Sequence, residues 1–455
     1  MLVVVLTPCF FAACSFQSYQ AKPLDPQASL AKLDEKDPNG SAFLQFMLAH
    51  GYQKDQLPVA AWGLEELTYC ALFFHPSLNV YQAQSRLAEL AVASAAESPV
   101  PTVNANLAHS NDPDPAKKPY ALGLSIDLPI VTASKGEIRV ENAKNLSDIA
   151  KLQLAQKAWQ VRNDLAQTWL EYHAKQEQIG LLSKEQGHYQ TIVAIHQKRV
   201  ELGLASNVEL SSARLQAQTN AALLDQAQQQ LLNLSNQLAS KLGLSPKQVK
   251  QMVLKNEISP PSKQDWSLAD IQRTALLNRI DLRIALLRYA SAEGKLKLEI
   301  ANQYPDLLIS PGYAIEFSDS VWSLGLSGLL NLLHKNKLAI AEAEQLREVE
   351  AAQFEALQSQ ILADTNGAHS ELAEAQRSLI KQQNLLSDQQ THEKRMSKLL
   401  SAGQIDRLAY TLAKLETVIA EKNLAVAQYQ FNDAVRKLEH AIEKPLTSAG
   451  AHHES

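Results

Sequence analysis

The chain has 455 residues, of which 20% are charged and 6% aromatic, and its formal net charge is −5. Long stretches consist mainly of Ala, Leu, Gln, Glu, Lys and Ser, a mixture typical of long helices and coiled coils rather than of two or three ordinary domains. The charges form no block of one sign and no basic face, so nothing favours a nucleic-acid partner.

The first residues are typical of an export signal. Leu2 to Ala13 are almost all apolar, and the run ends in small residues directly before Cys14. Such a run predicts a secretory signal peptide over 1–13, since a spanning helix needs about 20 residues. Small residues before a cysteine resemble a bacterial lipobox, which predicts that Cys14 is lipidated. An ordinary signal peptide with an incidental cysteine is the alternative.

The other cysteines suggest no chemistry. Cys9 lies in the signal segment, and Cys70 stands alone and is expected to be buried as a small apolar residue. No disulfide framework or CxxC metal pair follows from them.

The remaining chain shows one order of elements twice, after an N-terminal extension over 14–61 with a short helix near 40–50. The first half predicts a helix over 64–97, strands over 102–109 and 120–128, and helices over 134–202 and 208–242. The second half predicts a helix over 268–302, strands over 306–315 and 321–329, a helix over 332–402, and a last helix ending near 443. Pro101 and Pro305 are 204 residues apart, and Gly203 and Gly403 are 200 apart. We therefore expect two repeats, 62–258 and 259–445, followed by a disordered tail over 446–455.

The four short stretches decide the fold class. In the second, Leu122, Leu124, Ile126 and Leu128 alternate with small or polar residues, and the other three follow the same period of two. Each stretch is about nine residues long, enough to cross a membrane as a tilted strand. Four strands cannot close around a water-filled pore, whereas three copies would supply twelve strands. A four-stranded sheet buried in a soluble protein is the alternative, but it would not need helices this long.

The expected fold is therefore mainly α with a small membrane β-barrel. Each protomer contributes four strands and long antiparallel helical hairpins that form a tunnel, and a trimer forms a 12-stranded barrel. A helix of about 70 residues is on the order of 100 Å long. Its narrow, Ala-rich apolar stripes suit close helix packing.

From about Trp62 to Glu443 the sequence resembles the TolC-like outer-membrane efflux family. The duplicated order of elements and the two turns between long helices carry the resemblance. Pro129 after the second strand fits the family, whereas the matching Asn331 departs from it. The resemblance implies that the turns form a closed periplasmic mouth and meet the hairpins of a periplasmic adaptor. The residues in question are Arg199, Gly203, Leu204, Ser206, Gly403 and Gln404.

The resemblance further implies a passive, lipid-anchored homotrimeric duct in the outer membrane, with a long periplasmic portion. An inner-membrane pump, expected to be proton-driven, would supply the energy. Family members often carry acidic residues just after the turns, and Glu209 is such a residue here. The matching Ala409 is not acidic, and Asp406 is the nearest substitute. Three copies of either carboxylate would form a cation-selective ring. A solvated helix-end carboxylate or a helix cap is the alternative.

Two short segments, Tyr19 to Leu24 and Phe73 to Leu78, resemble a branch associated with heavy-metal efflux. Heavy-metal cations are therefore one expected substrate, and multidrug or other export is the alternative.

Other classes of protein fit less well. The twelve histidines include none at the spacing that puts two metal ligands on one helix face, and no nucleophile elbow or phosphate-binding loop is present. We expect neither an enzyme nor a cofactor or metal site. A soluble periplasmic coiled-coil scaffold would explain the helices, but not the signal segment or the four amphipathic strands.

Overall fold

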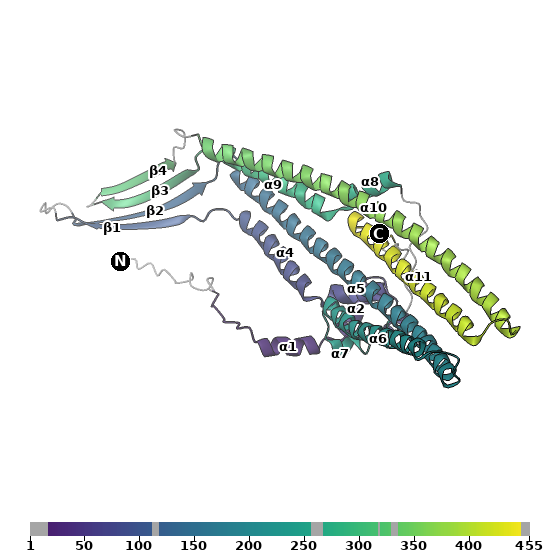
Figure 1. Ribbon diagram of the computed structural model, residues 1–455. Coiled ribbons are helices and arrows are strands. Elements are labelled where there is room, and N and C mark those ends of the chain that lie inside the picture. Colours follow the sequence, from purple (N-terminus) through teal and green to yellow (C-terminus); the bar gives the residue numbers. More distant parts are fainter. Residues whose placement is uncertain (1–16, 112–117, 256–266, 317–318, 329–334, 447–455) are drawn as a thin grey trace.

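The computed structural model describes residues 17–111, 118–255, 267–316, 319–328 and 335–446. The molecule is long and narrow, with four strands at one end and two helical hairpins that run to the other end (Figure 1). The strands are β1 Thr102–His109, β2 Tyr120–Ile130, β3 Leu307–Glu316 and β4 Asp319–Gly328. The first half contains α3 Leu64–Phe74, α4 Pro76–Ala95, α5 Lys135–Glu201 and α6 Asn207–Leu242. The second contains α8 Leu268–Asn278, α9 Ile280–Ala301, α10 Lys337–Ser401 and α11 Arg407–Ile442.

The helix predicted over 64–97 is wrong in one respect, because it is two helices. His75 is extended, with φ −70° and ψ 120°, and Pro76 begins α4. The residue before a proline is pushed out of the helical region, so the sequence contained this signal. The helix predicted over 268–302 is likewise divided, at Arg279, with φ −60° and ψ 123°. No proline marks that break, and Arg279 is instead held by hydrogen bonds to Asp281.

Other predicted boundaries differ by a few residues. The second strand continues through Pro129, which lies beyond the end of β1 and therefore needs no hydrogen bond on that side. The fourth strand begins two residues early, at Asp319. The helix predicted from 332 begins at Lys337, because Lys335 and Asn336 have left-handed backbones with φ 46° and 50°.

The N-terminal extension contains the predicted helix, α2 Ser41–Ala49, and elements that were not predicted: α1 Pro26–Asp34 and the 3₁₀ helix η1 Lys54–Gln56. The Asp25 side chain caps α1 by accepting a hydrogen bond from the Gln27 amide, and a proline follows it. Both are standard start signals that the sequence reading missed. A short helix, α7 Pro246–Val249, follows α6.

The four strands form one antiparallel sheet in the order β1-β2-β3-β4. The predicted alternation of apolar residues with small or polar ones is confirmed, and the apolar face of the sheet is the more exposed one. Along β2, Leu122, Leu124 and Ile126 are exposed, whereas the small residues between them, such as Gly123 and Ser125, are partly covered. Small side chains line that face because space is short. A Cβ added to Gly312 would lie 2.6 Å from the Ser323 hydroxyl oxygen.

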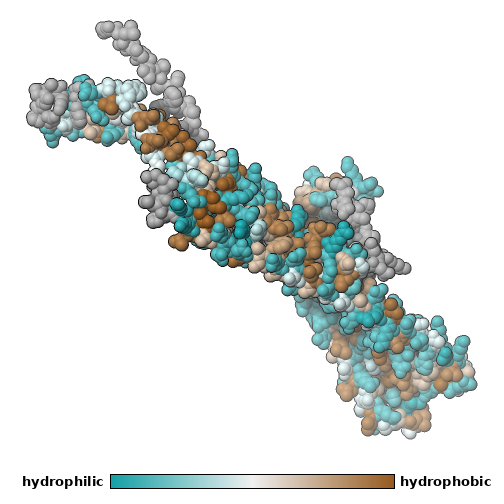
Figure 2. Space-filling view, turned by 90° about the horizontal axis from the view of Figure 1, so that it is seen from above, coloured by the Kyte–Doolittle hydropathy of each residue, from teal (hydrophilic) through white to brown (hydrophobic). Residues whose placement is uncertain are grey.

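Each half of the chain has its own hydrophobic core. The first core joins α2, α3, α5 and α6 and includes Leu165, Trp169 and the buried Cys70, whose burial was predicted. The second core joins α8, α10 and α11 around Ile271, Ile361 and Leu438, all of which are fully buried. Along the rest of the helices apolar and polar patches are interspersed (Figure 2). Within the described residues, no helix combines the length and apolarity that crossing a bilayer requires.

The backbone repeats itself closely. Ala133 and Ser134 have left-handed backbones before α5, as Lys335 and Asn336 do before α10. Helices α3 and α8 have equal lengths, as do α6 and α11. We call α3–β1–β2–α6, with the helices between them, the first repeat, and α8–β3–β4–α11 the second. The outer limits predicted for the repeats stay predictions, because 256–266 lie outside the described residues.

Candidate functional site

The two turns at the end opposite the sheet form the candidate site. Gly203 and Gly403 have left-handed backbones, with φ 71° and 68°. In the first turn the Gly203 amide donates to the Val200 carbonyl at 2.9 Å, and the Leu204 amide donates to the Arg199 carbonyl at 2.7 Å. The second turn has the same pair of bonds, so both helices end in a Schellman motif. The predicted turns are therefore confirmed as tight helix ends.

The first turn exposes a small apolar surface. Leu202, Leu204 and Val208 are 66%, 73% and 78% exposed. These residues lie at the turn between α5 and α6, a few positions after the partly exposed Arg199. Such a surface at the end of a hairpin is suited to contact another protein.

The two candidate ring carboxylates are both used at helix starts. Ser206 and Glu209 form a capping box: the Ser206 amide donates to the Glu209 carboxylate at 2.7 Å, and the Glu209 amide donates to the Ser206 hydroxyl at 3.2 Å. The hydrogen bonds from the Ser206 amide and hydroxyl lower the pKa of Glu209, so this exposed carboxylate is negative at neutral pH. Asp406 caps α11 by accepting from the Ala409 amide at 2.8 Å. The alternative role predicted for Asp406, as a cap, is confirmed.

An ion pair that sequence reasoning missed joins the two turns. Arg199 of the first turn lies 2.7 Å from Asp406 of the second. Both side chains are partly exposed, so the pair contributes roughly 0–1 kcal/mol. No local signal could have revealed it, because the two residues are 207 positions apart. The two turns are therefore tied side by side at their tips.

Behind the tips, α5 and α11 are joined by further ion pairs. Lys422 binds the buried carboxylate of Glu185 at 2.7 Å, and Lys184 binds Glu421 at 3.2 Å on the exposed side. Closer to the sheet, Arg162 binds the buried Glu439 at 3.4 Å. Burying a carboxylate is costly unless it is paired, so these contacts fix the register of the two helices.

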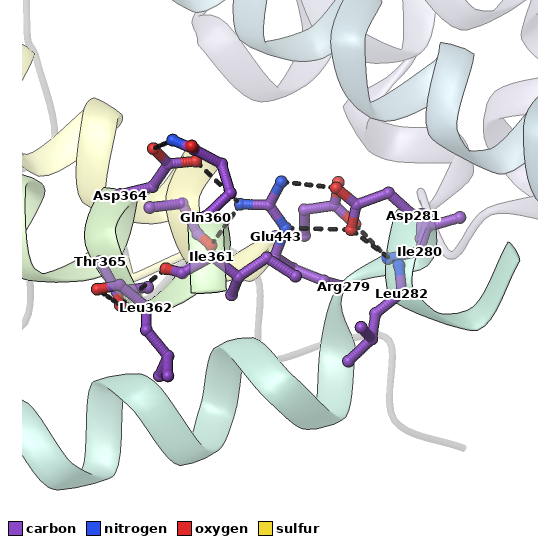
Figure 3. A network of polar contacts seen from close by, with 11 residues as sticks. Arg279, Ile280, Asp281, Leu282, Gln360, Ile361, Leu362, Asp364, Thr365 and Glu443 are labelled. Atoms are coloured by element: carbon purple, nitrogen blue, oxygen red, sulfur yellow. Dashed lines mark hydrogen bonds and ion pairs between the residues drawn. The ribbon is translucent and has the colours of Figure 1, made fainter. Parts of the chain in front are cut away.

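A polar network stands where the second repeat begins, at the break between α8 and α9 (Figure 3). Arg279 donates to both carboxylate oxygens of Asp281, at 3.0 and 2.6 Å, and lies 3.8 Å from Asp364. The carboxylate of Glu443, at the end of α11, accepts from the Ile280 amide at 2.6 Å. This network holds the extended backbone at Arg279 and connects α8, α9, α10 and α11.

A cavity of about 620 Å³ adjoins this network. Its walls include Trp159 and Asn163 of α5, and His440 and Glu443 at the end of α11. Burial lowers the pKa of His440 and raises the pKa of Glu443. Within the described residues no group of three or more metal-ligating side chains forms. The cavity walls carry charges of both signs, and some of these charges are paired, as Arg279 is with Asp281. The cavity is therefore a polar space between helices.

Comparison with known proteins finds one matching family model and several similar solved structures. Residues 67–244 match the family model described as outer membrane efflux protein. No curated protein sequence matches the chain. Three similar solved structures are VceC of Vibrio cholerae (18% identity, 84% of this chain and 96% of that one, TM-score 0.68), the outer-membrane channel OprN (15%, 94% and 98%, 0.68) and CusC (15%, 86% and 95%, 0.67).

The sequence match and the fold both resemble outer-membrane efflux channels. The first repeat carries the sequence signature of the outer membrane efflux protein family, and the chain as a whole has the fold of solved channels of this kind. The predicted resemblance to the TolC-like family is thereby confirmed.

Proposed function

We propose that the chain is the exit duct of a tripartite efflux system, a homotrimer that passively conducts substrates through the outer membrane. The observation that carries the proposal is the outward apolar face of the sheet. Trp322 is 82% exposed, Leu107 71% and Leu122 57%. A contiguous exposed apolar patch of this kind marks a surface that is covered by lipid or protein. Lipid suits it, since the strands have membrane-spanning length.

The sheet is also incomplete by itself. Its outer strands, β1 and β4, leave rows of unpaired backbone groups, and hydrocarbon tolerates only closed sheets. Three copies would close a 12-stranded barrel and remove every edge. The long helices would then continue the barrel as a tunnel about 100 Å long.

The tips are proposed to meet the other components. Arg199, Gly203, Leu204, Ser206, Gly403 and Gln404 would face the hairpins of a periplasmic adaptor, which joins the duct to an inner-membrane pump driven by protons. The exposed Leu204 supports this role for the first turn. Opening would separate the tip helices by untwisting, and the pair between Arg199 and Asp406 would hold the two turns of one chain together.

The lipid anchor is part of the proposal, although Cys14 lies outside the described residues. Cleavage after Ala13 would leave Cys14 as the first residue, and its acyl chains would fix the protomer to the membrane. The small residues before Cys14 support this anchor.

Heavy-metal cations are proposed as one cargo on the strength of two short segments only. The second segment, Phe73 to Leu78, stabilises the fold. Phe74 and Leu78 are buried in the first core, and His75 caps α4 by accepting a hydrogen bond from the Ser77 amide. Metal export would therefore depend on ion selectivity along the duct rather than on these residues.

The function is tested by reconstituting the purified protein in a planar bilayer. We expect water-filled channels that select cations, and reduced selectivity in a Glu209→Gln/Asp406→Asn variant. These substitutions remove the charges, while Asn keeps the ability to cap α11. Unchanged selectivity would contradict the carboxylate ring. Absence of any conductance both from the unchanged protein and from an Arg199→Ala variant, which lacks the pair between the two turns, would contradict the duct.

A further inference from the structure

We propose that the cavity between α5, α6 and α11 binds an amphipathic organic cation. The cavity has a volume of about 540 Å³, which lies within the range of about 300–1,000 Å³ of small-molecule sites. Three helices of a single chain form it, so the site does not depend on assembly of the proposed trimer. The proposed duct function assigns nothing to this cavity.

The cavity lies on the side of α5 that faces away from the first core. Its α5 wall includes Ala174, which follows Leu165 by nine residues, or about two and a half helical turns. Leu165 is fully buried in the first core, so Ala174 points the opposite way. In the proposed duct, α2 and α3 of that core would lie outside the wall, because they would otherwise fill the lumen. The cavity would therefore face the lumen.

Polar contacts fix α6 and α11 against α5 around the cavity. Lys175 of α5 donates to the Gln230 side chain of α6 at 2.8 Å. Lys422 of α11 binds Glu185 of α5 at 2.7 Å. Near the first of these contacts the α5 wall has only Ala174, whose side chain is a single methyl group. The helices are thus held in place while the space between them stays unfilled.

Each of the three helices contributes an apolar side chain to the wall. These side chains are Leu181 of α5, Leu234 of α6 and Val426 of α11. Leu181 is buried, whereas Val426 is 56% exposed at the open edge of the cavity. An apolar molecule in the cavity would cover Val426 and remove apolar surface from water, which favours binding. The apolar wall therefore suits the body of an amphipathic ligand.

The two lysines that line the cavity, Lys175 and Lys422, already have acceptors. Besides its bond to Gln230, the Lys175 ammonium donates to the Gln178 side chain at 2.8 Å, so two amide oxygens hold it. The charge of Lys422 is balanced by the Glu185 carboxylate. An anion that entered the cavity would compete with these acceptors, so the lysines do not favour an anionic ligand.

Glu171 is the carboxylate of the wall, and most of its hydrogen-bonding capacity is open. It accepts one hydrogen bond, from the Gln167 amide at 3.0 Å, and forms no ion pair with another described residue. Tyr429 of α11 lines the same cavity, and burial, with the negative charges of Asp433 and Glu171, raises its pKa. A carboxylate near an aromatic ring attracts an organic cation by charge and by the ring face.

A metal ion would find too few ligands here. Within the described residues no three metal-ligating side chains come together, and Glu171 is the only carboxylate among the residues that line this cavity. An organic cation needs a single carboxylate for its charge and can place the rest of its surface on the apolar wall. The cavity therefore suits an organic cation and not a metal cation.

The test is a fluorescence titration of the purified protein, in a nonionic detergent, with ethidium, an aromatic cation that becomes brighter when it leaves water. We expect saturable binding, weakened about tenfold or more in Glu171→Gln, which removes the charge and keeps the size of the side chain. Val426→Arg, at an exposed position, should also weaken binding because it places a competing cation at the cavity edge. The matched control is Glu177→Gln, an exposed carboxylate of α5 that does not line the cavity.

The outcomes separate the cavity from the duct. Weaker ethidium binding in Glu171→Gln and in Val426→Arg, with Glu177→Gln unchanged and all variants equally helical by circular dichroism, supports the site. Equal binding by all variants, or no more binding than to detergent alone, overturns it. Tighter binding of anilinonaphthalenesulfonate, an amphipathic anion, that is lost in Lys175→Gln would also overturn the cationic ligand. Binding in detergent requires no conducting pore, so each of these failures leaves the proposed duct intact.

Discussion

The C-terminal ends of α6 and α11 occupy the same position in the two repeats, but different residues stabilise the left-handed backbone at each end. Both C-caps are left-handed, at Gly243 with φ 70° and at Glu443 with φ 49°. At Gly243 the junction between α3 and α4 is so close that an added Cβ would lie 2.6 Å from the Phe74 carbonyl oxygen. At Glu443 a side chain fits, and its carboxylate caps the Ile280 amide. The backbone path is what the repeats share, while the side chains that hold it differ.

A second difference concerns the side chains that donate hydrogen bonds to the backbone carbonyls at these helix ends. In the first repeat the free carbonyls of Phe74 and Gly243 accept hydrogen bonds from Lys36 of the N-terminal extension, at 2.9 and 2.7 Å. In the second repeat Arg279 reaches the Ala441 carbonyl from within the repeat. The extension is therefore part of the first repeat's structure, and the second repeat replaces it with a residue of its own.

The largest effect is expected at Gly243. Gly243→Ala should reduce the free energy of unfolding by more than about 2 kcal/mol, because the left-handed backbone and the contact with the Phe74 carbonyl both penalise a Cβ. Glu443→Gly is the matched control and should cost no more than about 1 kcal/mol, for one lost hydrogen bond. Thermal midpoints in detergent measure both. Equal midpoints for the two variants would contradict the difference between the repeats.

The next effect concerns the seam between the repeats. Glu185→Ala leaves Lys422 without its buried partner and should cost about 2–3 kcal/mol, less than a fully buried pair because Lys422 is partly exposed. Lys184→Ala, one residue away, removes only an exposed pair and should cost less than about 1 kcal/mol. Chemical denaturation compares the two variants. A larger loss of unfolding free energy for Lys184→Ala would show that burial does not determine which of the two ion pairs is more stabilising.

A smaller effect depends on pH and concerns His173 in the first repeat. Burial lowers the pKa of His173 to about 4, whereas the matching position in α10, counted back from Gly403 as His173 is from Gly203, is Ala373. The unfolded chain takes up this proton near pH 6.5, so the stability that neutral His173 supports is lost as pH falls from about 6.5 toward 4. In His173→Gln the midpoint should fall less between pH 7 and 5. An unchanged pH slope would rule out His173 as the cause.

The smallest effect is local to the tips. Ser206→Ala removes the cap of α6 and should cost about 1 kcal/mol, whereas Asp406→Asn keeps a capping side chain and loses only the exposed pair with Arg199. Hydrogen exchange of the first amides of α6 and α11 should therefore accelerate more in Ser206→Ala. Faster exchange at α11 in Asp406→Asn would mean that the ion pair, and not the cap, holds the second tip.

The features that the sequence predicts correctly are those that depend on residues close together in the chain. Alternation placed all four strands, and Gly203 and Gly403 ended the long helices where the structure ends them. The break at Arg279 was missed because no proline marks it and its cause is a network that draws on Asp281 nearby and on Glu443 from far along the chain. The pair between Arg199 and Asp406 was missed for the same reason, since only the folded hairpins bring its members together.

The most direct test of the central claim is fractionation of the native cell envelope on a sucrose gradient, with and without Cys14→Ala. The proposed duct predicts recovery with the outer membrane as a detergent-stable trimer, and a shift away from that fraction when Cys14 is replaced. Recovery of the unchanged protein in the periplasmic fraction, as a monomer that needs no detergent, would contradict the duct and favour a coiled-coil scaffold.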